Sequence, residues 1–124
     1  CASHASQILA LGSFECKNEL EKNLETYREN RKILLAALSE MGFNNIAPPD
    51  GAFYLYIDIS AFSSDSYDFT IKMLNIGGVA ITPGIDFDPI KGKSKIRISY
   101  ARSTPEILKG IERMKIFMDK KKYL

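Results

Sequence analysis

The 124-residue sequence is poor in the residues on which several kinds of site depend. It contains one histidine, His4, two cysteines and no tryptophan. A single histidine excludes a site built from several imidazole groups, and Cys1 and Cys16 cannot form a disulfide framework or supply metal-ligand spacing. No apolar run reaches the roughly 18–20 residues of a membrane span, and no secretory signal is visible. We therefore expect a cytoplasmic protein that has no membrane contact.

The overall composition is that of one ordinary globular domain. Hydrophobic residues make up 45% of the chain and charged residues 26%, which argues against disorder. The net charge of +2 is too small to predict nucleic-acid binding. We expect a single domain over residues 1–124 with no nucleic-acid partner.

Four segments have the spacing of apolar residues that is typical of helices. A weak helix covers residues 3–11 and ends at Gly12. A long helix follows, closed by Gly42, with one apolar stripe: Leu20, Leu24, Tyr27, Leu34, Leu38 and Met41. A third helix begins in the polar residues 63–66, buries Phe69, Met73 and Ile76, and ends at Gly77-Gly78.

The last helix has the clearest start signal in the chain. Ser103 and Glu106 form a capping box, or Thr104 is the cap with Pro105 at the first helical position. The apolar face of this helix then comprises Ile107, Ile111, Met114 and Met118.

Three segments are predicted to be strands: residues 53–59, 79–81 and 95–100. In the first, Phe53, Leu55, Ile57 and Ile59 share one face, and Tyr54, Tyr56 and Asp58 share the other. In the last, Ile96, Ile98 and Tyr100 face one way, and Arg97 and Ser99 the other. Residues 85–94 are expected to form a loop. The order of elements predicts an α+β fold in which helices cover a small sheet of about three strands.

Two motifs resemble nucleotide-binding or RNA-binding signatures, but only in part. Gly92-Lys93-Ser94 resembles the tail of a phosphate-binding loop, yet Phe87 stands where that motif needs glycine, so a solvated loop is favoured. Residues 50–57 resemble an RNA-recognition strand, with Asp50 and Ala52 in place of a basic and an aromatic residue. RNA binding remains a minor alternative.

The other candidate groups are expected to have structural roles. His4 has no partner carboxylate nearby, and the two thiols have no second histidine to activate them. Asp86 and Asp88 supply too few oxygen ligands for a metal ion and are expected to form a turn.

Arg97 is the residue whose position most needs an explanation. It lies in the middle of a predicted strand, between Ile96 and Ile98, where a guanidinium is costly to place unless an anion meets it. Its planar fork matches a carboxylate in two parallel hydrogen bonds. The spacing leaves three interpretations open: a ligand carboxylate, a pair with an acid such as Asp58, or an outer sheet face.

Three motifs occur in order along the chain: residues 49–54 (PDGAFY), residues 78–84 (GVAITPG) followed by Phe87, and residues 96–101 (IRISYA) leading into the final helix. In this order and spacing, the sequence resembles the C-terminal segment of class I/II pyridoxal-phosphate-dependent aminotransferases of fold type I. The resemblance is to the branch that contains bacterial-type aspartate aminotransferases, and it covers essentially the whole chain. It implies the fold of their small domain.

The resemblance also implies a function. Arg97 stands at the position of the arginine that binds the substrate α-carboxylate, and substrates would be an amino acid, with aspartate as one candidate, and a 2-oxo acid. The cofactor lysine, in a Ser-x-Ser-Lys-like context, has no counterpart here, and Lys95 lies in the wrong element. We therefore expect residues 1–124 to lack the large cofactor-binding domain, to bind no pyridoxal phosphate covalently and to be inactive alone. The intact enzyme is expected to be a homodimer; a related lyase or synthase is the alternative.

Overall fold

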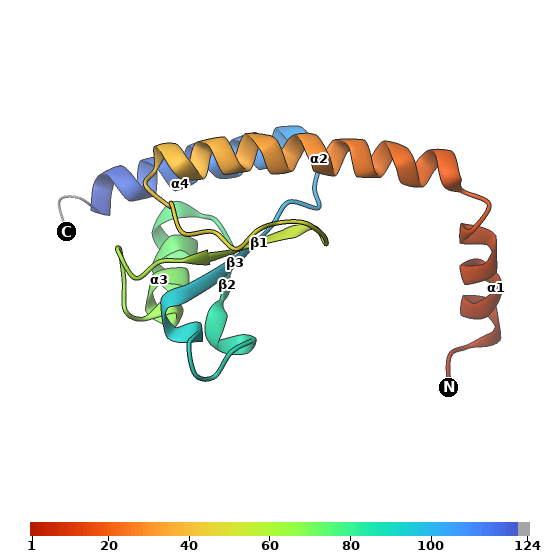
Figure 1. Cartoon of the computed structure of the whole chain (residues 1–124), viewed down its shortest axis with the longest axis horizontal. Helices are drawn as coiled ribbons and strands as arrows, with labels where there is room; N and C mark the ends of the chain where they lie inside the picture. Colours follow the sequence, from red (N-terminus) through yellow and green to blue (C-terminus); the bar gives the residue numbers. More distant parts are fainter. Residues whose placement is uncertain (122–124) are drawn as a thin grey trace.

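The computed structural model describes residues 1–121, which form helices packed on a small sheet (Figure 1). Besides two short 3₁₀ turns, Gly84–Asp86 and Gly92–Ser94, the elements are these in chain order: α1 His4–Ser13, α2 Lys17–Glu40, β1 Tyr54–Asp58, α3 Ser66–Lys72, the π-helical turn η1 Met73–Gly77, β2 Thr82–Pro83, β3 Lys95–Ser99 and α4 Thr104–Lys121. The predicted α+β fold is confirmed.

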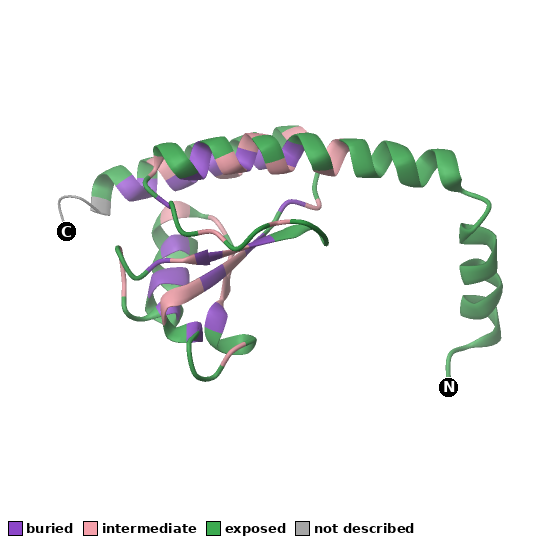
Figure 2. Ribbon diagram, viewed as in Figure 1, coloured by how far each residue is buried: buried purple, intermediate pink, exposed green. Residues whose placement is uncertain are grey.

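The sheet has three antiparallel strands in the order β1-β3-β2, so the strand that carries Arg97 is central. Alternate residues of β1 and β3 are buried, including Leu55, Ile57, Ile96 and Ile98. These side chains form one core with the apolar faces of α2, α3 and α4 (Figures 1 and 2). Because side chains of a strand alternate between faces, Arg97 lies on the face of the sheet away from that core.

The structure differs from the sequence prediction at three places near the sheet. The second strand pairs through Thr82 and Pro83, and residues 79–81 lie outside the ladder. The N–H of Val79 instead donates to the carbonyl of Met73. The hydrogen bonding of β2 with β3 therefore begins further along the chain. Ile76 is 53% exposed because the chain leaves the α-helical period in η1. Phe53 precedes β1 and is 50% exposed.

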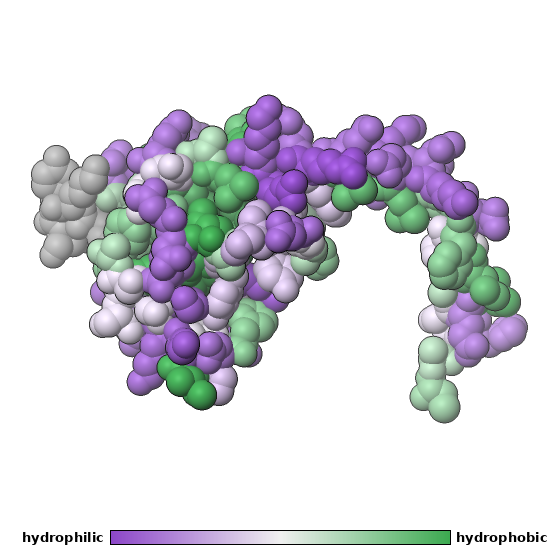
Figure 3. Space-filling model, in the orientation of Figure 1, coloured by the Kyte–Doolittle hydropathy of each residue, from purple (hydrophilic) through white to green (hydrophobic). Residues whose placement is uncertain are grey.

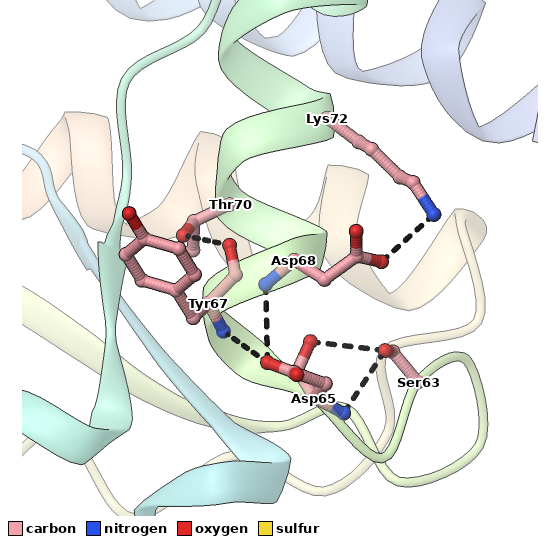
Figure 4. Close-up of polar contacts among 6 residues, drawn as sticks. All are labelled: Ser63, Asp65, Tyr67, Asp68, Thr70 and Lys72. Carbon is pink, nitrogen blue, oxygen red and sulfur yellow. Dashed lines mark hydrogen bonds and ion pairs between the residues drawn. The ribbon is translucent and has the colours of Figure 1, made fainter.

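The start of α3 is fixed by a dense set of local hydrogen bonds (Figure 4). The carboxylate of Asp65 accepts from the N–H groups of Tyr67 and Asp68 at 2.9 and 3.1 Å. The Ser63 hydroxyl in turn accepts from the N–H of Asp65, at 3.1 Å. These bonds satisfy N–H groups that have no partner within the helix, so α3 begins at a defined residue and its Ser66 is held in the core.

The N-terminal arm, which we define as residues 4–24 (α1, the turn after it and the start of α2), projects away from the sheet (Figure 1). All its residues are exposed (Figure 2), although the pattern predicted burial of Leu20 and Leu24. Its exposed apolar side chains (Figure 3) are these: Ile8, Leu9, Leu11, Phe14, Leu20 and Leu24. None of the helices within residues 1–121 combines the length and apolar character needed to cross a membrane.

Candidate functional site

Arg97 lies at the centre of the open face of the sheet. It is paired with Tyr56 of β1 on one side and with Thr82 of β2 on the other. Since directly opposed residues of antiparallel strands place their side chains on the same face, these three side chains form one row across the sheet. The side chain of Arg97 is half-buried in this row.

Two aromatic rings lie against the guanidinium of Arg97. Its Cζ is 4.3 Å from the centroid of the Phe87 ring and 5.2 Å from that of Tyr54. Within residues 1–121, no acidic side chain lies within ion-pair distance of Arg97, and none of the hydrogen bonds found there involves its guanidinium. The guanidinium therefore lies over two aromatic rings, and its N–H groups remain available to an anion.

The alternative that Arg97 pairs with Asp58 is wrong, because Asp58 binds Lys95. The Nζ of Lys95 lies 3.0 Å from Oδ2 of Asp58, and both side chains are largely shielded from solvent. Hydrogen bonds from Ser60, together with the one from Lys95, lower the pKa of Asp58 to about 2. This pair occupies the end of the sheet and leaves the charge of Arg97 uncompensated.

The loop that carries Phe87 is closed at its base by two glycines. Gly84 and Gly92 are both buried, and a Cβ built on Gly84 would lie 2.6 Å from the carbonyl oxygens of Gly92 and Lys95. The buried hydroxyl of Ser66 donates to the carbonyl of Gly92 at 2.9 Å. This hydrogen bond joins the base of the loop to α3. The expectation of a solvated loop is therefore wrong for Gly92, although Lys93 is exposed. Because the loop is closed at Gly84 and Gly92, Phe87 lies over the sheet.

The other end of β3 is held by α2 and by the turn before β1. The buried amide of Asn30 donates to the carbonyls of Tyr100 and Arg102, at 3.1 and 2.7 Å. The hydroxyl of Tyr100 donates to the carbonyl of Ala52 at 3.1 Å. Ala52 has a left-handed φ of 59°. No local sequence pattern predicts these hydrogen bonds, because each joins segments that are far apart in the chain.

Tyr56, the neighbour of Arg97 across the ladder, has a buried hydroxyl with no hydrogen-bond partner among the described residues. Burial raises the pKa of Tyr56, and the negative charge of Asp88 raises it further. An unpartnered buried hydroxyl costs free energy, so this side chain contributes to stability through its ring rather than its oxygen.

The remaining candidates do not assemble into a second site. His4 is exposed at the start of α1, and Cys1 and Cys16 are exposed free thiols. Asp88 accepts from the N–H groups of Ile90 and Lys91, both at 2.9 Å, which confirms its role in a turn and lowers its pKa. Among the described residues, no group of three or more potential metal ligands lies together.

The chain was compared with known proteins and with solved structures. A family model described as aminotransferase class I and II matches residues 2–113. The chain belongs to this family. It is 45% identical over 116 residues to the valine–pyruvate aminotransferase of Mycobacterium tuberculosis, covering 92% of this chain. It is 38% identical over 117 residues to the (5-formylfuran-3-yl)methyl phosphate transaminase of Methanocaldococcus jannaschii, covering 93% of this chain.

Solved structures of the class I and II family have the same fold. A proposed aminotransferase from Silicibacter pomeroyi superposes with a TM-score of 0.93 at 49% identity, over 97% of this chain and 32% of that one. An aminotransferase from Mycobacterium tuberculosis gives 0.81 at 44% identity, over 83% and 27%. The chain spans 30% of the length of the two curated relatives named above.

Proposed function

We propose that the chain is the C-terminal small domain of a pyridoxal-phosphate-dependent aminotransferase. The enzyme moves an amino group between an amino acid and a 2-oxo acid, and Arg97 binds the α-carboxylate that both substrates carry. The observation that carries the proposal is a half-buried guanidinium on the central strand that lies over two aromatic rings and has no acidic partner among the described residues. Membership of the family and the aminotransferase names of the relatives support it.

The role of Arg97 follows from the chemistry of its side chain. A guanidinium fixed in position can grip a carboxylate through two parallel N–H···O bonds, which fixes both the position and the rotation of the substrate. Holding the substrate in one orientation brings its reacting carbon to a defined place and reduces the entropy cost of the reaction. The arrangement serves every amino acid and 2-oxo acid equally, so side-chain specificity has to come from other residues.

The residues described here fit the substrate anchor and do not by themselves fit pyridoxal phosphate. The lysine nearest to Arg97 in the sequence is Lys95, and its ammonium group is engaged with Asp58 at 3.0 Å. A lysine that carries the cofactor has to be free to form and break a bond to it. In our proposal the cofactor is therefore held by a large domain that precedes this one in the enzyme. The enzyme is a homodimer in the cytoplasm.

The test is to replace Arg97 in the enzyme that contains this chain and to measure transamination. Arg97→Ala should lower kcat/KM by a factor of about 30 to 4,000, because removing one partner of a charged, hydrogen-bonded pair costs about 2–5 kcal/mol. The loss should occur for the amino acid and for the 2-oxo acid alike, since both present the same group.

Arg102→Ala is the matched control. Arg102 lies five residues further along, is exposed, and its guanidinium lies 3.9 Å from the carboxylate of Glu106. This variant should retain the wild-type kcat/KM. If Arg97→Ala behaves in the same way as Arg102→Ala, Arg97 does not bind the substrate.

A further inference from the structure

Phe87 and Tyr54 reach the guanidinium of Arg97 from different parts of the chain. Tyr54 belongs to β1, two residue pairs away from Tyr56 along the ladder with β3, whereas Phe87 belongs to the loop closed by Gly84 and Gly92. Both aromatic side chains are partly exposed, at 38% for Tyr54 and 49% for Phe87. Their contact with Arg97 therefore does not follow from burial in a common core.

We infer that Phe87, assisted by Tyr54, is a positioning residue that clamps the guanidinium of Arg97 so that its N–H edge is presented to a carboxylate. The face of an aromatic ring attracts the positive charge of a guanidinium without using its N–H donors in conventional hydrogen bonds. An arginine side chain without such support loses rotamer entropy when it binds a ligand, and a clamp removes part of that cost beforehand. The ligand part of this inference rests on the proposed function.

The base of the loop explains how an exposed phenylalanine can hold a fixed position. Gly84 and Gly92 are in backbone contact, Ser66 anchors Gly92, and the side chain of Asp88 caps the next turn. The carbonyl of Gly84 also accepts from the N–H of Phe87 at 3.0 Å. The backbone on both sides of Phe87 is thus hydrogen-bonded, and only its ring is free to pack on Arg97.

The clamp can be tested by NMR on the 124-residue chain, using the Nε–Hε resonance of Arg97 identified by its loss in Arg97→Lys. Phe87→Leu should remove the ring-current shift of this resonance and lower the order of the Nε–Hε vector. Phe87→Tyr, which keeps the ring, should restore both. If Phe87→Leu leaves shift and order unchanged, the clamp does not exist.

The link to ligand binding is tested by titrating the same chain with pyruvate, up to tens of millimolar. Phe87→Leu should weaken binding two- to five-fold, which corresponds to about 0.5–1 kcal/mol for an exposed cation–π contact. Phe14→Leu is the matched control, because Phe14 is exposed in the turn between α1 and α2, and it should bind as the wild type does. Thermal melts of all variants establish that they are folded.

The outcomes separate this inference from the function on which it rests. If the wild-type chain binds pyruvate at Arg97 and Phe87→Leu binds equally well, the positioning role is overturned and the anchor role of Arg97 stands. If the folded wild-type chain shows no shift of the Arg97 resonance with pyruvate, the chain by itself does not bind a carboxylate at Arg97 and the ligand part of the inference is overturned, whereas the anchor role in the enzyme is decided by Arg97→Ala. The Nε–Hε spectra without pyruvate still decide whether the clamp itself is present.

Discussion

Tyr56 of β1 and Tyr100, which directly follows β3, differ in how their hydroxyl groups are satisfied. The hydroxyl of Tyr100 donates to Ala52, while that of Tyr56 is buried without a partner among the described residues. A net hydrogen bond is worth about 1 kcal/mol, whereas a buried hydroxyl without one carries a desolvation cost. Removal of the two oxygen atoms should therefore have effects of opposite sign.

Tyr56→Phe should leave the free energy of unfolding unchanged or raise it by up to about 1 kcal/mol, and Tyr100→Phe should lower it by about 1 kcal/mol. Urea denaturation of the two variants beside the wild type measures both effects. A loss in Tyr56→Phe as large as that in Tyr100→Phe would mean that the hydroxyl of Tyr56 has a partner in solution.

Asp58 should make the stability of the chain depend on pH in the acidic range. Its pKa is about 2 in the folded chain against an ordinary 3.8. Because the folded pKa is the lower one, the stabilisation is complete above about pH 5 and is lost as the pH falls through 3.8 toward 2. Asp58→Asn should cost about 1 kcal/mol at pH 7, less than the full shift implies because solvent screens the pair.

Denaturation of Asp58→Asn and wild type from pH 7 down to pH 2 measures this prediction: the difference between them should shrink as the pH falls. The exposed Asp50 makes no ion pair among the described residues, so Asp50→Asn is the control and should match the wild type throughout. A difference that stays constant with pH would show that Asp58 stabilises the fold without its charge.

At the scale of elements, the loop of residues 84–92 depends on two glycines more than on any side-chain contact. Gly84→Ala should lower the free energy of unfolding by about 2–3 kcal/mol, because its Cβ would meet backbone atoms that cannot rotate away. Gly110→Ala provides the contrast: its Cβ meets nothing within 4 Å in α4, so helix propensity should raise stability by about 0.5–1 kcal/mol. Equal effects of the two substitutions in chemical denaturation would contradict this account.

The elements themselves could largely be predicted from the sequence, and the reasons differ between them. Alternation identified β1 and β3, and the capping residues of α4 placed its start, because both signals are local. The start of β2 at Thr82 could not be predicted, since it depends on a carbonyl of η1 that accepts a hydrogen bond from the N–H of Val79. Arg97 stood out because its position is costly, whereas its contact with Phe87 depends on how the nine-residue loop 84–92 folds back over the sheet.

At the scale of the whole molecule, the apolar residues of α2 divide into a buried set and an exposed set. Leu38 is 0% exposed and Leu24 is 42% exposed, although both belong to the same stripe in the sequence. Leu38→Ala should cost about 2–5 kcal/mol of unfolding free energy, as expected for a buried leucine. Leu24→Ala should cost less than about 0.5 kcal/mol in this chain.

Thermal and urea denaturation of the 124-residue chain compare these two variants directly. A large loss in Leu24→Ala would mean that the arm packs against something in solution, such as a second copy of the chain. Sedimentation at two concentrations then distinguishes self-association from folding of the arm onto its own sheet.

The length of α2 has a mechanical consequence. Its 24 residues contain neither glycine nor proline, so it is a stiff rod about 36 Å long with no built-in joint. Its C-terminal half packs into the core that it shares with the sheet carrying Arg97, and its N-terminal end stands clear of the sheet (Figure 1). A tilt of about 5° at the embedded end therefore sweeps the free end through about 3 Å. A partner bound to the arm would thus act on a helix whose Asn30 donates to the carbonyls of Tyr100 and Arg102, directly after the strand that carries Arg97.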